Sequence, residues 1–385
     1  MKKIVDIFGA GISGCTMARL YAEIGYQVNL YEIKNEIGGN CFDYLDKNGI
    51  YVHKYGPHIF HTNNDRVINF IKKFAKFNGY KHHVLANVKS KLVPLPINFK
   101  SINILFPKES NKIIDLLKKN FKNKSYITLF ELMKIKNPLI KRLSKFLYDN
   151  VYANYTAKMW GINIKNIDPK VISRVKIILS DLDTYFPEDK FQGLPLEGYT
   201  NMMKNIINHK NIHLFVRSKY KVTFNKNNIC MNNKPNKNLI FYSGPIDELL
   251  NSKYGMLPYR SLYIKFKNLK KQSFQDCSVI NYPAHKKMTR ITEYKKMTLQ
   301  NSKNTVISEE YPNKYDLKSK KFNNRYYPIQ NKKSATIYNK YMSYLNKFSN
   351  FYPLGRLAEY KYYDMDDAIL NTIELFDQLT SNYEK

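Results

Sequence analysis

The sequence predicts an α/β protein in which a βαβ domain carries an inserted helical domain and is joined to an antiparallel β-sheet domain. The first forty residues indicate a strand, a tight turn, a helix and a second strand, in that order. Residues 101–160 carry apolar side chains three and four apart, which is typical of helices. Segments after residue 258 alternate between apolar and polar residues, which is typical of antiparallel strands. A chain of 385 residues is too long for one core, so we expect two or three domains.

Further segments predict single elements. Residues 63–77 carry an apolar stripe typical of a helix, and Asn137-Pro138 is expected to break one helix of the segment 101–160. Residues 84–93 alternate loosely, which predicts one strand. Residues 212–216 and 239–242 are expected to be strands that return to the sheet of the N-terminal unit.

The N-terminal unit carries a glycine motif between its first strand, residues 4–8, and its helix, residues 15–24. Gly9, Gly11 and Gly14 form a G-x-G-x-x-G pattern. Gly9 permits the tight turn, Gly11 lets a pyrophosphate approach the backbone, and Gly14 lets the helix pack close to the sheet. The helix N-terminus then faces the phosphates with free N–H groups and the positive end of its dipole. The motif therefore predicts a bound dinucleotide.

The residues that follow favour FAD over NAD. Glu32 ends the second strand, residues 28–31, where a carboxylate can accept both ribose hydroxyls. Gly38, Gly39 and Asn40 come next, and a glycine pair lets a second loop pass close to a cofactor. Many flavoproteins have this glutamate and glycine pair, so the preference for FAD over NAD rests on analogy with them. The alternative is that the motif is only a glycine-rich turn in an ordinary α/β domain. We predict an FAD-binding Rossmann-like (βαβ) domain.

The charge of the chain admits two interpretations. The formal net charge is +32, from 63 Lys and Arg against 31 Asp and Glu. Such an excess is found in proteins that bind nucleic acid or membrane surfaces. Here the basic residues are spread along the chain without an Arg-rich run, which favours a general compositional bias. We predict no nucleic-acid partner, although the charge would help to attract an anionic substrate.

Membrane and cysteine signals are weak. We find no apolar run of the ~18 residues needed to span a bilayer, and Asp6 with the glycine motif argues against a signal peptide. The four cysteines show no C-x-x-C spacing, so we expect reduced thiols and neither a disulfide framework nor a metal site. We predict a cytoplasmic protein without membrane insertion.

Later segments offer candidate ligand groups. His58 and His61 could be metal ligands, but no other cluster supports a metal, and the alternative is that they cap a turn. Tyr155 and Trp160 suit an aromatic wall that stacks a uracil ring, although a solitary tryptophan is usually part of a core. Arg174 precedes loop-rich sequence, which suits a closing lid that clamps a pyrophosphate. The alternative for Arg174 is a surface arginine with a local carboxylate partner.

The motifs resemble those of the prokaryotic UDP-galactopyranose mutases. Residues 55–62, Tyr-Gly-Pro-His-Ile-Phe-His-Thr, follow the FAD-type N-terminus as they do in that family. Leu-Pro-Ile-Asn at 95–98, Tyr-Thr-x-Lys-x-Trp-Gly at 155–161 and Thr-Arg-Ile-x-Glu at 289–293 also match. Gly-Arg-Leu at 355–357 and Tyr-x-Asp at 362–364 complete the set. The resemblance extends from the glycine motif to the terminal helix.

The resemblance implies roles for individual residues. Arg174 and Arg290 are the expected catalytic residues, as a pair that clamps the substrate pyrophosphate. The expected cofactor-binding residues are Gly9, Gly11, Ile12, Ser13, Gly14, Glu32, Gly39, Asn40, His58, Ile59, Arg356, Asp364 and Met365. The expected substrate-binding residues are Tyr155, Trp160, Tyr185, Asn281, Tyr327, Tyr362, Asp364, His61 and His82. No metal is expected.

The resemblance also implies a function. The family interconverts UDP-galactopyranose and UDP-galactofuranose through a covalent adduct between the sugar and N5 of reduced FAD, for cell-surface glycan precursor synthesis. We therefore predict such an isomerase, with an unidentified reductant and a homodimeric assembly. The rival interpretations are an FAD amine oxidase or desaturase, and a non-catalytic basic binding protein. Acceptance of UDP-N-acetylgalactosamine is left open.

The sequence departs from the family pattern at three places. Either His82 or His83 replaces an asparagine contact, or that contact is lost. Val151 and Tyr152 stand where two phenylalanines flank the uridine, which predicts weaker nucleotide affinity. Pro353 removes one donor from the strand before Gly355. We expect the FAD-binding domain at 1–78, 190–250 and 345–385, the helical substrate domain with its mobile loop at 99–189, and the sheet domain at 79–98 and 251–344.

Overall fold

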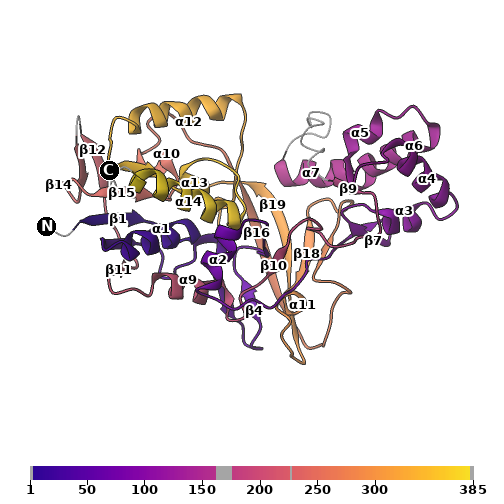
Figure 1. The fold of residues 1–385 in the computed structure, drawn as a ribbon, viewed down its shortest axis with the longest axis horizontal. Helices are drawn as coiled ribbons and strands as arrows, with labels where there is room; N and C mark the ends of the chain where they lie inside the picture. The colour runs from indigo at the N-terminus through magenta and orange to yellow at the C-terminus, as the bar shows by residue number, and fades with distance from the viewer. Residues whose placement is uncertain (1–2, 162–175, 226–227, 382–385) are drawn as a thin grey trace.

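The structure is a computed structural model that describes residues 3–161, 176–225 and 228–381. Figure 1 shows a body formed by the N- and C-terminal segments, a sheet beside it and a helical lobe beyond the sheet. The predicted lid arginine, Arg174, lies outside the described residues, as does the segment 171–175 around it. We propose the division into three domains with the boundaries predicted from the sequence.

The N-terminal body contains a parallel sheet in the order β11-β2-β1-β15-β21. This arrangement confirms the predicted strand–turn–helix–strand unit and the predicted return of two later strands to its sheet. Pro353 lies in the edge strand, where a missing N–H is tolerated. The strands are β1 (Ile4–Phe8), β2 (Gln27–Tyr31), β11 (Ile212–Phe215), β15 (Leu239–Tyr242) and β21 (Phe351–Pro353).

Four α-helices build the core against this sheet. Val5, Ile7, Val28 and Leu30 are fully buried, because helices cover the faces of the parallel sheet. The cluster continues into the buried faces of the helices. These are α1 (Ile12–Glu23), α2 (Asp65–Lys72), α9 (Gly198–Ile207) and α14 (Met365–Thr380).

The second sheet has the order β20-β16-β19-β18-β17-β6-β7, and its neighbours are antiparallel except for the parallel pair β17 and β6. The prediction of one strand over 84–93 is wrong. Lys89 and Ser90 take positive φ values of 50° and 65° and turn the chain back. The strands are β6 (Val84–Val88), β7 (Lys91–Leu95), β16 (Tyr259–Leu269), β17 (Val279–Asn281), β18 (Arg290–Glu293), β19 (Thr305–Lys314) and β20 (Tyr327–Pro328).

The helical lobe confirms the prediction of helices between residues 101 and 160. Asn137 caps α6 by accepting the N–H groups of Leu139 and Ile140, and Pro138 occupies the first helical turn, which explains the predicted break. A π-helical turn, Tyr148–Tyr152, joins α6 to α7. The helices are α3 (Phe99–Leu105), α4 (Ser110–Asn120), α5 (Leu129–Met133), α6 (Pro138–Leu147) and α7 (Ala153–Trp160).

The helix predicted over 63–77 is shorter in the structure. It is α2 (Asp65–Lys72), capped by Asn64, and the chain then leaves the helix so that Phe77 bridges Pro195. The remaining helical segments are η1 (Gly39–Cys41), α10 (Ile246–Leu249), α11 (Tyr294–Thr298), α12 (Lys332–Leu345) and α13 (Gly355–Ala358). The small strands are β3 (Asp43–Leu45), β4 (Tyr51–His53), β5 (Phe60–Thr62), β8 (Tyr126–Thr128), β9 (Lys176–Ile178), β10 (Phe191–Gly193), β12 (Val222–Asn225), β13 (Asn228–Met231) and β14 (Lys234–Asn236).

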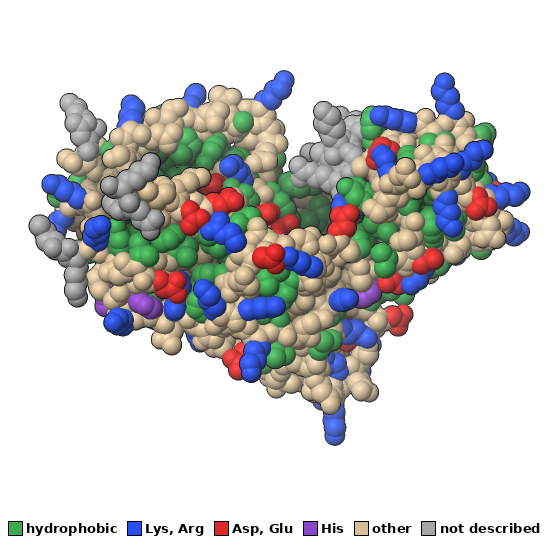
Figure 2. All heavy atoms as spheres, viewed as in Figure 1, with side chains coloured by type: hydrophobic (Ala, Val, Ile, Leu, Met, Phe, Trp, Pro, Cys, Tyr) green, Lys and Arg blue, Asp and Glu red, His purple; other side chains and the backbone are tan. Residues whose placement is uncertain are grey.

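The surface is hollowed between the lobe that contains α12 and the lobe that contains α5 and α6 (Figure 2). Among the described residues, no helix has both the length and the apolar character needed to cross a membrane. The four cysteines, all described, form no disulfide.

Candidate cofactor and substrate site

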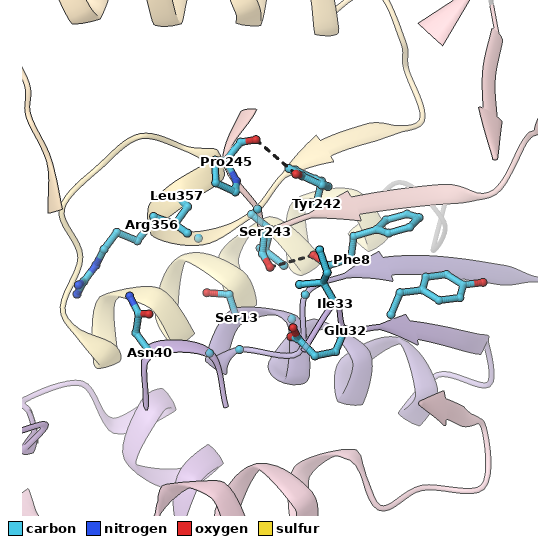
Figure 3. Close-up of a pocket in the computed structure, with 18 of the residues that line it drawn as sticks. Phe8, Ser13, Glu32, Ile33, Asn40, Tyr242, Ser243, Pro245, Arg356 and Leu357 are labelled. Carbon is cyan, nitrogen blue, oxygen red and sulfur yellow. Dashed lines mark hydrogen bonds between the residues drawn. The ribbon is translucent and has the colours of Figure 1, made fainter. Parts of the chain in front are cut away.

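A cavity of about 620 Å³ lies at the carboxyl ends of the parallel strands, where open α/β sheets bind ligands. Phe8, Tyr31 and Tyr242 line it, and each stands at the end of its strand. In Figure 3, Ser13 and Glu32 approach this space opposite Ser243, while Asn40 and Arg356 lie at one end of it. The cavity is thus bordered by several loops that the sheet brings together.

The glycines of the motif create the space that the sequence predicted. Gly9 has φ +103°, and a Cβ there would lie 2.1 Å from the Ser243 hydroxyl. A Cβ on Gly14 would lie 1.9 Å from the carbonyl oxygen of Gly9, so α1 could not pack as it does. A Cβ on Gly39 would lie 3.2 Å from the Cα of Gly11. The two loops therefore meet through bare backbone at the start of α1.

Glu32 is held in place by backbone donors. Its Oε2 accepts from the Ala10 N–H at 2.8 Å and its Oε1 accepts from the Lys34 N–H at 2.9 Å. The side chain is buried yet borders the cavity. The carboxylate is therefore fixed at the end of β2 with lone pairs still available to a ligand.

The structure brings most of the predicted cofactor residues together. The exception is Ile59, which does not line the cavity and packs instead beside the apolar cluster around Tyr80 and Tyr294. The predicted residues that do line it are Gly9, Gly11, Ile12, Ser13, Gly14, Glu32, Gly39, Asn40, His58, Arg356, Asp364 and Met365.

Sequence reasoning missed part of the cavity wall. Ser218 follows β11 and Ser243 follows β15, and both line the cavity. The Ser218 hydroxyl is buried without a hydrogen-bond partner among the described residues. The signal was available, because the carboxyl ends of parallel strands meet at one edge, and both strands had been predicted to join this sheet.

Arg356 connects the cavity to a group of aromatic rings. Its guanidinium donates to the carbonyl oxygen of Tyr363 and lies 5.8 Å from the Tyr327 ring and 5.1 Å from the Tyr362 ring. Tyr327 and Tyr362 are 5.6 Å apart, and Trp160 lies 6.5 Å from Tyr327. Three predicted substrate residues, from α7, β20 and the loop before α14, thus adjoin the cofactor cavity.

Arg290 and Glu310 form a largely buried ion pair beside these rings. They stand opposite one another on β18 and β19, with the Arg290 Nε 2.8 Å from a Glu310 Oε2 that is 0% exposed. Burial alone would lower the pKa of Arg290, but Glu310, Tyr155 and Tyr327 outweigh it and raise the pKa well above its ordinary value. Arg290 therefore stays charged. Glu310 was not among the predicted site residues.

The neighbouring phenols keep their protons. Burial raises the pKa of Tyr155, Tyr185 and Tyr327, while Arg290 acts in the opposite direction on each. Protonated phenols near a cation can donate hydrogen bonds to phosphate oxygens. Asn281, at the end of β17, has a buried side-chain oxygen without a hydrogen-bond partner among the described residues.

The histidines occupy different surroundings. His58 donates from Nδ1 to the Gly56 carbonyl oxygen at 2.7 Å, and burial lowers its pKa to about 3. His61 Nδ1 lies 2.6 Å from Asp189 Oδ2, and its ring stacks on Phe186. Burial also lowers the pKa of His82 to about 3, and its Nδ1 contacts the Tyr80 hydroxyl at 3.1 Å. His58 and His82 are therefore neutral at pH 7.

Asp364 and the pair Val151 and Tyr152, which the sequence also singled out, lie in different parts of the structure. Asp364 is part of the cavity wall, and burial raises the pKa of its carboxyl while His61 and Arg356 lower it. Val151 and Tyr152 belong to the core of the helical lobe, each 4% exposed.

Within residues 3–161, 176–225 and 228–381, no group of three His, Cys, Asp or Glu residues could hold a metal ion.

A parallel sheet, a glycine turn at a helix N-terminus and a cavity at the strand ends together define a dinucleotide-binding protein of the Rossmann type. A model of NAD(P)-binding Rossmann-like domains accordingly matches residues 7–74. A model of UDP-galactopyranose mutases matches residues 150–362.

Similar proteins agree with this family. A UDP-galactopyranose mutase of Mycoplasma genitalium is 40% identical, over 97% of this chain and 94% of that protein. A dTDP-fucopyranose mutase of Escherichia coli is 34% identical over 97% of each. The crystal structure of a reduced UDP-galactopyranose mutase matches with a TM-score of 0.67 at 16% identity, covering 99% of this chain and 96% of that one. The chain belongs to the UDP-galactopyranose mutase family.

Proposed function

We propose that the protein binds FAD and interconverts UDP-galactopyranose and UDP-galactofuranose. The observation that carries this proposal is the junction at Arg356, where the dinucleotide cavity meets the rings of Tyr327 and Tyr362 and, beyond them, Arg290. A sugar nucleotide in this arrangement could place its sugar beside the cofactor and its diphosphate beside a permanent cation. The family membership supports the same reaction.

The residues around the cavity fit FAD. The bare backbone at Gly11 and Gly39 leaves room for a pyrophosphate at the start of α1. Glu32 offers acceptors for ribose hydroxyls, and the unpartnered Ser218 hydroxyl offers a further polar contact. Reduced FAD held by these residues would supply a nucleophilic flavin nitrogen, N5, for covalent catalysis at the anomeric carbon of the sugar without net oxidation.

The protein's own residues act on the diphosphate. Arg290 stabilises the negative charge that gathers on departing UDP, and Tyr155, Tyr185 and Tyr327 donate hydrogen bonds to its oxygens. Glu310 holds the guanidinium in one orientation. Arg174 is the proposed second clamp, which would close over the substrate and keep UDP close for its return.

The sugar is proposed to lie between Tyr362 and Asp364, beside the flavin. Tyr362 contacts both Tyr327 and Arg356, so it links the sugar pocket to the diphosphate site. His61 and His82 are proposed to shape the remaining wall, since His61 influences Asp364 and the His82 ring lies 5.4 Å from Tyr185. Neither is assigned as an acid or a base.

The relative from Escherichia coli supports a second candidate function, the isomerisation of dTDP-fucopyranose. One experiment separates the candidates: dithionite-reduced protein is incubated with UDP-galactofuranose or dTDP-fucopyranose, and the products are separated by chromatography. We expect UDP-galactopyranose to form from the first substrate. No conversion by protein with bound FAD would contradict the proposal, and oxygen consumption with an amine would indicate the amine-oxidase rival.

We also propose a reductant, an assembly state, a cellular location and a biological role for the protein. The reaction needs FAD in its reduced form, so an outside reductant of unknown identity must supply electrons. A homodimer in the cytoplasm and a role in cell-surface glycan precursor synthesis follow from the family resemblance. Analytical ultracentrifugation of the FAD-bound protein would test the assembly state.

A further inference from the structure

Helix α7 carries Tyr155 and Trp160, and most of its side chains are only partly buried. Of its residues Ala153–Trp160, all described, only Ala153 is buried. The preceding helix, α6, buries Ile140, Leu143 and Leu147 on one face. The π-helical turn before α7 also interrupts the regular hydrogen-bond ladder between the two helices. Because apolar burial normally supplies most of a helix's stability, α7 needs another anchor.

Arg260 provides one anchor at the C-terminal end of α7. Arg260 extends from β16 and is only 5% exposed, and its Nε donates to the Met159 carbonyl oxygen at 2.6 Å. Its Nη2 donates to the Lys158 carbonyl oxygen at 2.8 Å. These carbonyls have no partner within the helix, and a cation there also complements the helix dipole.

Gly161 makes this contact possible. It ends α7 with φ +64°, and a Cβ there would lie 2.2 Å from Nη1 of Arg260. Any side chain would therefore displace the guanidinium from the helix end. The Tyr-Thr-x-Lys-x-Trp-Gly motif therefore ends in glycine because the Arg260 guanidinium lies against this position, a contact that the neighbouring sequence does not indicate.

Lys158 provides the second anchor. Its Nζ donates to the carbonyl oxygens of Tyr282 and His285 at 2.7 Å and of Met288 at 2.9 Å. These three carbonyls belong to the loop that joins β17 to β18. Burial lowers the pKa of Lys158 to about 8, so at pH 7 the ammonium form with three donors predominates.

The loop that Lys158 holds is bordered by two substrate residues. Asn281 ends β17 on one side of it, and Arg290 begins β18 on the other. Arg260 stands opposite Tyr327 in the pairing of β16 with β20. The two cations thus join the helix that carries Tyr155 and Trp160 to the strands that carry the diphosphate contacts.

We propose that Lys158 and Arg260 are positioning residues that fix α7 against the sheet, so that Tyr155 and Trp160 keep one orientation toward the nucleotide of the substrate. This inference rests on the proposed function for the identity of the ligand. Neither residue is assigned contact with the reacting atoms. Without the anchors, α7 would be free to move away from the sheet and the nucleotide would lose part of its contact surface.

The test uses the full-length FAD-bound protein, with UDP as the probe. We expect Lys158→Met to raise the dissociation constant of UDP about tenfold, as measured by calorimetry, with the flavin content unchanged. In turnover assays we expect KM to rise while kcat stays within about twofold. Lys158→Arg should restore part of the affinity, because a guanidinium can also donate to several carbonyls.

Lys145→Met is the matched control, since Lys145 is on α6 with its side chain 79% exposed and paired with Asp149. We expect its UDP affinity to equal that of the wild type. The proposal would be overturned if Lys158→Met bound UDP with a dissociation constant within twofold of the wild type. This holds even if the melting temperature fell, because Lys158 would then stabilise the fold without affecting nucleotide binding. A mutant cycle with Trp160→Phe should give less than additive losses if Lys158 acts through α7.

The outcomes for the two proposals are separable. If the wild type converts UDP-galactofuranose but Lys158→Met binds UDP normally, only the positioning role is wrong. If Lys158→Met weakens UDP binding but the wild type converts no sugar nucleotide, only the proposed function is wrong. A wild-type protein that does not bind UDP would contradict both.

Discussion

The cavity at the strand ends and the proposed substrate region beside Arg290 are held by different kinds of contact. The cavity lies at the ends of buried parallel strands, and its glycines bring bare backbone close together at Gly9, Gly14 and Gly39. The substrate region draws side chains from α7, β17, β18 and β20, and ion pairs and cation–carbonyl contacts orient them. Backbone geometry therefore fixes the first region, whereas the second depends on a few polar contacts. Substitutions should reveal this contrast as losses of different kinds.

The largest effect is expected at the glycine turn. Gly14→Ala would place a Cβ 1.9 Å from the Gly9 carbonyl oxygen, so α1 must move away from the sheet. We expect loss of bound FAD, measured by flavin absorbance, and an unfolding free energy lower by about 3 kcal/mol. The control is Gly49→Ala, where φ is +69° but no atom lies within 4 Å. It should cost about 1 kcal/mol and retain FAD; equal flavin loss in both variants would contradict the steric reason.

The next largest effect concerns turnover without loss of cofactor. Arg290→Ala removes the charge beside the proposed diphosphate site, and Arg174→Ala removes the proposed second clamp. We expect each variant to lose at least about a hundredfold in kcat/KM while the flavin spectrum stays that of the wild type. Reduced-enzyme assays with UDP-galactofuranose would measure this. A near-normal rate in either variant would show that its arginine is not a clamp.

A loss of stability without loss of cofactor is expected at Glu310, which orients Arg290. Glu310→Gln leaves a largely buried guanidinium without its carboxylate, so the unfolding free energy should fall by about 3 kcal/mol with FAD retained. Glu309→Gln is the control, because Glu309 pairs with the partly exposed Lys267 one position along the strand. Its expected cost is at most about 1 kcal/mol. Equal costs, measured by urea unfolding, would mean that burial of the pair does not matter.

The two regions also share a pH dependence of stability. Burial lowers the pKa of His53, His58 and His82 to about 3, below the ordinary value of 6.5. The unfolded chain therefore binds more protons between these values, and stability present above pH 6.5 is lost as the pH falls. Each histidine contributes at most about 1.4 kcal/mol per pH unit.

Urea unfolding at pH 7, 6 and 5 would measure this slope. His82→Gln should reduce the slope by the share of one histidine, with the other two unchanged. An identical slope in wild type and variant would mean that His82 takes up a proton in the folded state.

The sequence located most residues of the cavity at the strand ends because its signals are local. The glycine motif, Glu32 and the glycine pair lie within one βαβ unit, so spacing alone placed them. Ser218 and Ser243 were missed, since their loops come from strands that are distant in sequence. The hairpin at Lys89 and Ser90 was missed because neither residue is the Asn, Asp or Gly that usually takes positive φ in a two-residue hairpin turn.

The substrate region was harder to predict from residues alone. The Arg290–Glu310 pair depends on the register of β18 with β19, which no local pattern specifies. The same holds for Arg260 and α7, which meet across about a hundred residues of chain. Without the family resemblance, Tyr185, Asn281 and Tyr327 would have had no sequence signal. Arg174 remains a prediction outside the described residues.

The π-helical turn at Tyr148–Tyr152 has a geometric consequence for the aromatic rings. Each residue of a helix advances the side-chain direction by about 100°, and the wider turn inserts an extra increment between α6 and α7. The side chains of Tyr155 and Trp160 therefore point in a different direction, relative to the buried apolar face of α6, than they would in a continuous α-helix. Removing one residue from this turn would rotate both rings around the helix axis relative to α6, so the direction of the two rings depends on chain length at a single point.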